Sequence, residues 1–90
     1  MRLFEEIMSV LGPDGEVLFG GAKVVMYAGK CAYFENVKSI HSFSDGELIL
    51  LLKEGSVTAE GSGFSIARYG DGDLLLKGNV RSVRVGDEKV

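Results

Sequence analysis

The residues that could do chemistry in this chain are few. It contains one histidine, His41, and one cysteine, Cys31. An enzyme needs a nucleophile or a metal, a base and an orienting group within reach of one another, and zinc sites combine several Cys or His ligands at short spacings. His41 stands alone among Val37, Ile40 and Phe43, as structural or surface histidines do, and a lone buried cysteine usually acts as a small hydrophobe. The sequence therefore predicts no enzyme, no metal and no cofactor.

Two acidic pairs flank glycines in turn-like segments. Asp45 and Glu47 form the first pair, and Asp71 and Asp73 form the second. They look like fragments of a calcium loop, but the extended ligand series and terminal Glu of such loops are missing, so turn formation explains them better. The glycine-rich stretch Gly61–Phe64 lacks both the spacing and the following helix of a phosphate loop. We predict a hairpin turn there.

Basic residues gather slightly late in the chain, at Arg68, Lys77, Arg81 and Arg84. Nucleic-acid binding would require stacking aromatic pairs beside them, and none accompanies them in the sequence. Acidic residues are interleaved, and the net charge of −3 with 26% charged residues gives no bulk attraction to nucleic acids or anionic membranes. We expect neither nucleic acid nor a small-molecule substrate as a partner.

An amphipathic helix is predicted for residues 2–11. Apolar residues recur there at steps of three and four, and the segment Gly12–Gly15 ends the pattern. A helix this short is marginal in water alone, so its apolar stripe must dock on something. The sequence leaves open whether this is the chain's own sheet, a partner protein or a membrane surface. The stripe consists of Leu3, Phe4, Ile7, Met8 and Leu11.

The rest of the chain predicts a mainly β fold. Ninety residues with 46% apolar composition make a single domain, residues 1–90. From Glu16 onward, turn signals recur every eight to twelve residues, a spacing typical of β sandwiches and barrels. Thirteen glycines against one proline suit tight hairpins. We expect about eight short antiparallel strands in a small sandwich, roll or barrel.

Consecutive apolar residues interrupt the alternation expected of strands with one solvated face. They occur at 24–27, 48–52 and 74–76, and such runs fit strands covered on both faces. A chain this small has little left to cover a second face, so we expect one of the faces Leu48/Leu50/Leu52 or Ile49/Leu51 to be core. The other would meet the helix or another subunit, in a homo-oligomer or a complex with a partner protein. The candidate interface residues are Leu48, Ile49, Leu50, Leu51 and Leu52, with Phe4, Ile7 and Met8 of the helix.

The segment CAYFENVKSIHSFSDGELILLLKEGSVTAEGSGFSIARYGDGDLLLKGNVRSV makes up more than half of the chain. It contains a Glu35-Asn36 pair, an aliphatic strand after an acidic turn within Asp45–Lys53, the turn Lys53–Gly55 and a final run Leu76–Val83. In the order of these features the chain resembles the YabP/YqfC family of bacterial sporulation proteins. Glu35 and Asn36 are the most recognisable signature, and a turn asparagine bonded to nearby backbone explains the pair structurally.

The resemblance implies a non-enzymatic protein made during endospore formation. The resemblance implies action in spore envelope (coat or cortex) assembly, through self-association or docking to a membrane-protein or coat-protein partner of the sporulation programme. A single cysteine and the acids Glu5 and Glu6, where a signal peptide would be apolar, favour a cytoplasmic location. The resemblance narrows this to the mother-cell side of the forespore. The alternative is a small β-barrel module that binds a ligand or nucleic acid, which salt-dependent oligonucleotide binding would support.

Overall fold

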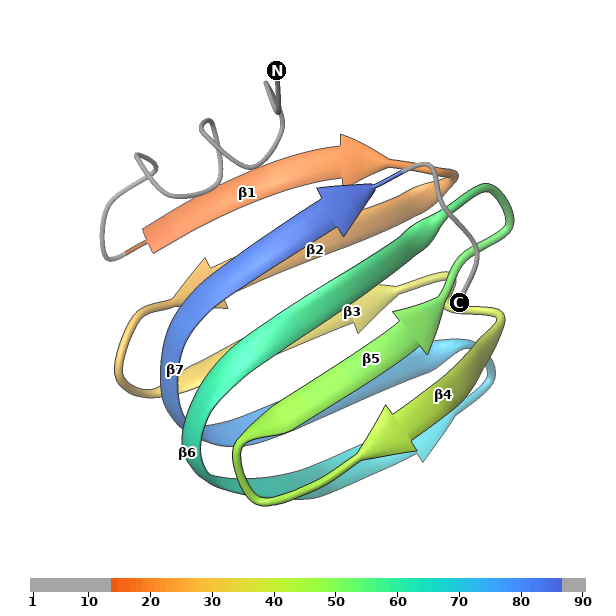
Figure 1. The fold of residues 1–90 in the computed structure, drawn as a ribbon. Coiled ribbons are helices and arrows are strands. Elements are labelled where there is room, and N and C mark those ends of the chain that lie inside the picture. The colour runs from red at the N-terminus through yellow and green to blue at the C-terminus, as the bar shows by residue number, and fades with distance from the viewer. Residues whose placement is uncertain (1–13, 87–90) are drawn as a thin grey trace.

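The computed structural model describes residues 14–86, without the side chains of Asp14, Gly15 and Val17. The helix predicted at residues 2–11, with Phe4, Ile7 and Met8, lies outside the described residues. Seven strands form one sheet, every neighbouring pair is antiparallel, and the order is β1-β2-β3-β7-β6-β5-β4 (Figure 1). The strands are β1 (Asp14–Phe19), β2 (Ala22–Tyr27), β3 (Cys31–Glu35), β4 (Ser39–Phe43), β5 (Glu47–Leu51), β6 (Ser56–Gly70) and β7 (Asp73–Gly86).

The predicted mainly β class is confirmed, but the number and lengths of the strands differ from the prediction. The segments SVTAEG and FSIARY are both parts of β6, which has 15 residues, and DLLLKG and NVRSVRV are both parts of β7, which has 14. Within residues 14–86 the sheet is open and does not close into a barrel. Two long strands therefore replace four short ones.

The long β6–β7 hairpin folds the sheet over on itself into two layers (Figure 1). Near its turn, residues 74–77 of β7 pair with β3, and residues 65–70 of β6 pair with β7. At its far end, residues 56–60 of β6 pair with β5. We call β1, β2, β3 and the turn half of the hairpin the first layer, and β4, β5 and the far half the second layer.

The bend in the hairpin lies at Gly61–Phe64, where a separate turn was predicted. That prediction is wrong, because β6 continues through this stretch and pairs with β7 before and after it, with register shifts at Glu60/Gly61 and Ser62/Ser65. A Cβ atom on Gly61 would lie 1.9 Å from the Asn79 carbonyl oxygen, and one on Gly78 would lie 2.6 Å from the Gly63 carbonyl oxygen. Glycine allows the two backbones to approach this closely where a bulged strand changes direction.

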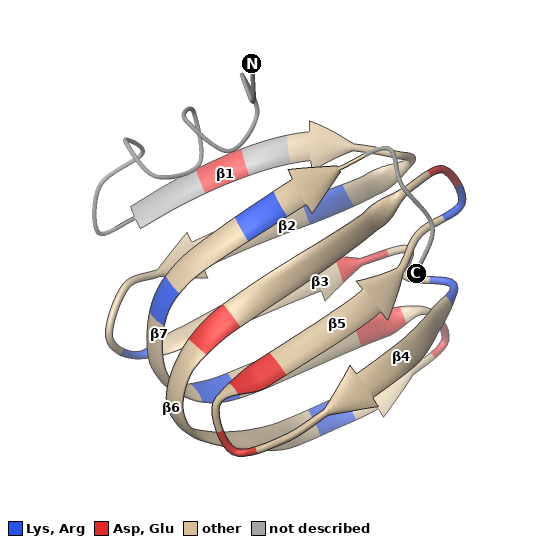
Figure 2. Ribbon diagram, viewed as in Figure 1, with Lys and Arg blue, Asp and Glu red and all other residues tan. Residues whose placement is uncertain are grey.

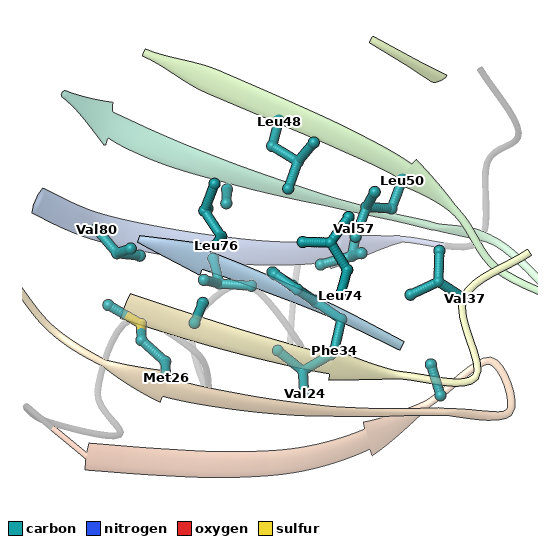
Figure 3. Packing of buried hydrophobic residues seen from close by; sticks show 14 of the residues in the cluster. Val24, Met26, Phe34, Val37, Leu48, Leu50, Val57, Leu74, Leu76 and Val80 are labelled. Atoms are coloured by element: carbon teal, nitrogen blue, oxygen red, sulfur yellow. The ribbon is translucent and has the colours of Figure 1, made fainter. Parts of the chain in front are cut away.

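The core fills the space between the two layers. Buried and half-exposed side chains alternate along β2, β3 and β5; in β5, Leu48 and Leu50 are fully buried while Ile49 and Leu51 are half-exposed. Leu48 and Leu50 point from the second layer toward Phe34 and Leu74 of the first (Figure 3). The buried hydrophobic residues are Ala22, Val24, Met26, Ala32, Phe34, Val37, Leu48, Leu50, Leu52, Val57, Ala59, Phe64, Leu74, Leu76, Val80, Val83 and Val85.

Candidate functional site

Asn36, of the signature pair, ties the end of β3 to two other hairpins. It has a positive φ of 66°, a conformation that Asn tolerates better than most residues. Its side-chain Nδ2 donates a hydrogen bond of 2.8 Å to the Gly21 carbonyl oxygen in the β1–β2 turn. Its backbone N–H donates to Oδ1 of Asp73 at 3.3 Å, at the start of β7. Asn36 thus lies between β3 and β4, but its side chain bonds the backbone of a different hairpin and not the nearby backbone that the sequence predicts.

Backbone hydrogen bonds extend these contacts to four connecting segments. The Val37 N–H donates to the Gly72 carbonyl at 2.7 Å, and the Glu54 N–H donates to the Gly20 carbonyl at 3.3 Å. We call the segments 20–21, 36–38, 52–55 and 71–72 the loop junction. A shallow hollow beside it is lined by Asn36, Val37, Lys38 and Lys53. Because these contacts are mostly to backbone, they give Asn36 a structural role at the junction.

The chemically reactive residues are not brought together. His41 is exposed at a register shift in β4 of the second layer, whereas Cys31 is half-buried on β3 of the first. Asp45 and Asp71 lie in the β4–β5 and β6–β7 turns, as their sequence context predicts. Within residues 14–86, no group of three or more His, Cys, Asp or Glu residues could hold a metal ion. In the same part of the chain, no helix has the length and apolar character needed to span a membrane.

The outer face of the first layer carries a row of partly exposed apolar side chains. The ladder registers align Glu16, Val25, Tyr33, Leu75 and Arg68 across β1, β2, β3, β7 and β6. Val25, Tyr33 and Leu75 are each half-exposed and point away from the core, since their neighbours in sequence are buried. The row is therefore apolar at its centre and charged at its two ends.

Two further apolar residues lie beside this row. Leu18 of β1 is 73% exposed and Tyr27 of β2 is 42% exposed. Charged residues surround them, including Lys23, which makes a 3.4 Å ion pair with Glu16. Figure 2 shows basic and acidic positions interleaved over the strands, rather than gathered in an area of one sign. This face thus combines an apolar centre with a rim of mixed charge.

The phenol of Tyr33, at the centre of the row, has a raised pKa. Its hydroxyl donates a hydrogen bond of 3.3 Å to Oδ2 of Asp73. Partial burial, then the negative charges of Asp73 and Glu35 and the hydrogen bonds to them, raise the pKa of Tyr33 above its ordinary value of 10.0. The phenol therefore stays neutral and able to donate throughout the physiological pH range.

The outer face of the second layer is more polar. Ile49 of β5 lies between Ser42 of β4 and Thr58 of β6, and Arg84 of β7 completes this row. Arg84 makes a 3.1 Å ion pair with Glu60 on the same face. Apolar exposure here is limited to the half-exposed Ile49 and Leu51.

The structure places the predicted interface residues in two environments. Leu48, Leu50 and Leu52 lie in the core at 2% exposure or less, so they are not available to a partner in the folded domain. Ile49 and Leu51 remain available, and Phe4, Ile7 and Met8 fall outside the described residues. One of the faces Leu48/Leu50/Leu52 and Ile49/Leu51 was expected to be core, and the structure shows that it is Leu48/Leu50/Leu52.

Leu18, Val25, Tyr27, Tyr33 and Leu75 were not predicted as interface residues. The signal was present for Val25, Tyr27 and Leu75, because they belong to the consecutive apolar runs at 24–27 and 74–76. The sequence alone could not show that these runs lie in one layer with their outer side chains in register.

These features define a small mainly β domain, with one sheet folded into two layers around a leucine- and valine-rich core. The chain belongs to the YabP family, whose model matches residues 20–90, a range that includes strands β2 to β7. The expected resemblance over the central and C-terminal segments is thereby confirmed, and the family connects the chain with sporulation. No curated protein and no solved structure matches the chain.

Proposed function

We propose that the protein is a non-enzymatic sporulation protein that acts in assembly of the spore envelope. It works by self-association or by docking to a membrane-protein or coat-protein partner, on the mother-cell side of the forespore. Family membership supports the role in sporulation. The observation that carries the assembly role is the apolar row Val25–Tyr33–Leu75, with Leu18 and Tyr27 beside it.

A contiguous apolar patch with a polar rim is the usual mark of a protein–protein interaction site. Two of the four large hydrophobic residues described as exposed, Leu18 and Tyr27, lie on this face. Aromatic side chains such as Tyr27 and Tyr33 are also the residue types enriched at energetically important positions of interfaces. The more polar outer face of the second layer serves as an internal comparison within the same domain.

A genetic experiment tests the proposed role. The gene is deleted in its endospore-forming host and complemented with the wild type, with a Val25→Glu/Leu75→Glu variant or with Thr58→Glu on the second layer. We expect deletion to lower the yield of heat- and lysozyme-resistant spores. The wild type and Thr58→Glu should restore the yield, and the Val25→Glu/Leu75→Glu variant should not. Urea unfolding of the purified variants shows whether both remain folded.

The outcomes test three parts of the proposal separately: the role, the face and the location. Normal resistant-spore yield in the deletion strain would contradict a role in envelope assembly. Full restoration by a folded Val25→Glu/Leu75→Glu variant would contradict assembly through this face. A fluorescent fusion that does not gather at the forespore surface during sporulation would contradict the proposed location.

A further inference from the structure

Two rows on the outer face of the first layer carry opposite charges on the two sides of β3. The central row begins with Glu16 on β1 and ends with Arg68 on β6. In the adjacent row, Lys23 on β2 lies on one side of β3, and Asp73 on β7 lies on the other. β3 is the middle of the five strands of this layer. Reversing the strand order about β3 therefore places Glu16 where Arg68 was and Lys23 where Asp73 was, so each position changes sign.

We infer that this face binds a second copy of the chain, about a two-fold axis that runs over β3 and nearly parallel to it. The inference rests on the self-association included in the proposed function and names the surface that carries it. Such an axis reverses the strand order of one sheet relative to the other. β1 and β2 of one protomer then face the partner's β6 and β7.

This arrangement is complementary in both charge and polarity. Glu16 faces the partner's Arg68, and Lys23 faces the partner's Asp73; symmetry makes each of these pairs twice. Val25 faces the partner's Leu75, and Tyr33 faces the partner's Tyr33. Glu35 faces the partner's Glu35 near the axis. The interface therefore has one like-charged pair and four pairs of opposite charge, two Glu16–Arg68 and two Lys23–Asp73.

The geometry of packed sheets is compatible with these pairs. Two sheets stack about 10 Å apart with their strands about 30° from parallel. A position two strands from the axis is thereby displaced along the strands by about 5 Å, because neighbouring strands are about 4.8 Å apart. Glu16 and Arg68 lie at this distance, and their long side chains can span such a displacement. Val25 and Leu75 lie one strand from the axis and are displaced half as far.

The size of the face indicates a weak complex. Five strands with five or six residues each cover about 24 by 18 Å, on the order of 400 Å² of flat area per protomer. Standard interfaces bury about 800 Å² per partner, and smaller ones belong to transient complexes. We therefore expect dissociation constants in the micromolar range or above, and the association must be measured over about 10–500 μM.

Cys31 gives a direct test of the axis. It is the only cysteine of the chain and lies half-buried on β3, on the same face as Tyr33. An axis over β3 brings the two Cys31 thiols toward each other across the interface. A short bismaleimide should therefore cross-link the full chain into a covalent dimer. A Cys31→Ser/Thr58→Cys variant, with its thiol on the outer face of the second layer, should not cross-link above the background of random collisions.

Charge reversal supplies the matched variants. We expect Arg68→Glu alone and Glu16→Arg alone to weaken dimerisation at least fivefold by light scattering or sedimentation, and to lower the cross-linking yield in parallel. The double variant Glu16→Arg/Arg68→Glu should restore both readouts to near wild-type values. Glu60→Arg on the second-layer face should leave dimerisation unchanged.

Three results would overturn the inference. The first is a chain that stays monomeric at 500 μM and does not cross-link. Envelope assembly would then depend on a membrane-protein or coat-protein partner, and the spore assay tests that role separately. A dimer that cross-links through Thr58→Cys but not through Cys31 would place the interface on the other layer. Equal dimerisation of the single and double charge variants would remove the proposed pairing of Glu16 with Arg68.

Discussion

Asn36 meets two requirements that few residue types satisfy together. Its positive φ disfavours most residues with a Cβ atom, although Asn tolerates this conformation. Its position also requires a side-chain donor directed at the Gly21 carbonyl. Glycine would satisfy the first requirement and lose the second, whereas alanine would satisfy neither. The residue type at this position is therefore explained by local geometry.

Substitutions at Asn36 should separate these two contributions. We expect Asn36→Gly to lower the free energy of unfolding by about 1 kcal/mol through loss of a solvent-exposed hydrogen bond. Asn36→Ala should cost about 1 kcal/mol more because of the left-handed backbone. Urea denaturation measures both. Asn79→Ala is the control, since its Nδ2 makes only a 3.5 Å surface contact with Ser62 Oγ; equal losses in all three variants would contradict this assignment.

Tyr33 should make the stability of the domain depend on pH in the alkaline range. Its pKa is raised in the folded protein, above 10.0, by partial burial and by the charges of Asp73 and Glu35. A raised pKa means that the folded state holds the proton more tightly than the unfolded state. The stabilising contribution is therefore fully present below about pH 10 and is lost as the pH rises through the folded-state pKa.

Unfolding midpoints in urea, measured from pH 8 to pH 11, test this dependence. We expect the wild type to lose stability above about pH 10 more steeply than Tyr33→Phe, which lacks the ionisable phenol. The difference between the two proteins isolates Tyr33 from the other tyrosines. Parallel profiles for the two proteins would contradict a raised pKa of Tyr33 in the folded state.

At the scale of elements, β6 shows how a strand can change layers without losing its partner. Register shifts at Glu60/Gly61, Ser62/Ser65 and Ile66/Arg68 divide its ladder with β7 into short regular parts. Bulges increase local twist and bend. A hairpin with several of them can therefore fold over a core instead of extending as a flat ribbon.

Two glycines of β6 should respond very differently to substitution. We expect Gly61→Ala to destabilise the domain by about 3 kcal/mol, since the new Cβ would overlap the backbone carbonyl of Asn79. Gly70→Ala should change stability by less than about 0.5 kcal/mol, because a Cβ there meets nothing within 4 Å. Thermal unfolding compares the two variants, and a tolerated Gly61→Ala would show that the bend can form without this close approach.

The sequence was sufficient for the fold class but not for the path of the longest strands. Alternation and glycine punctuation predicted the strand segments of β2, β3 and β5 closely, and the run Leu48–Leu52 correctly pointed to a core face. The stretch Gly61–Phe64 was misjudged, because the same glycines that permit a hairpin turn also permit a bulged bend. Which of the two forms depends on the partner strand, and that information is not local.

For the whole molecule, the position of each strand in the sheet predicts a pattern of local stability. Residues 74–76 of β7 have β3 on one side and β6 on the other, and residues 57–59 of β6 lie between β5 and β7. By contrast, β4 and residues 65–70 of β6 each have one partner strand in the described sheet. Edges of this kind are shortened or bulged in many proteins, as β4 is at its register shift.

Hydrogen exchange should therefore divide β6 into two parts. We expect amides of residues 57–59 to exchange at least tenfold more slowly than those of residues 66–69, although both segments belong to one continuous strand. Exchange measured by NMR on the free domain at low concentration resolves the two segments. Uniform protection along β6 would mean that its edge half has a further partner in solution.

The β6–β7 hairpin, which contributes to both layers, is the last part of the sheet to be synthesised. Translation produces β1 to β5 first, and these strands carry the inward apolar side chains of both layers before either layer can close. The first layer is completed by the turn half of the hairpin and the second by its far half, so both wait for residues 56–86. A nascent chain that ends at Leu52 lacks β6 and β7, which join the two layers and supply Leu74 opposite Leu48 and Leu50 (Figure 3). Ribosome-bound intermediates of this domain should accordingly be the species most exposed to chaperones and to aggregation.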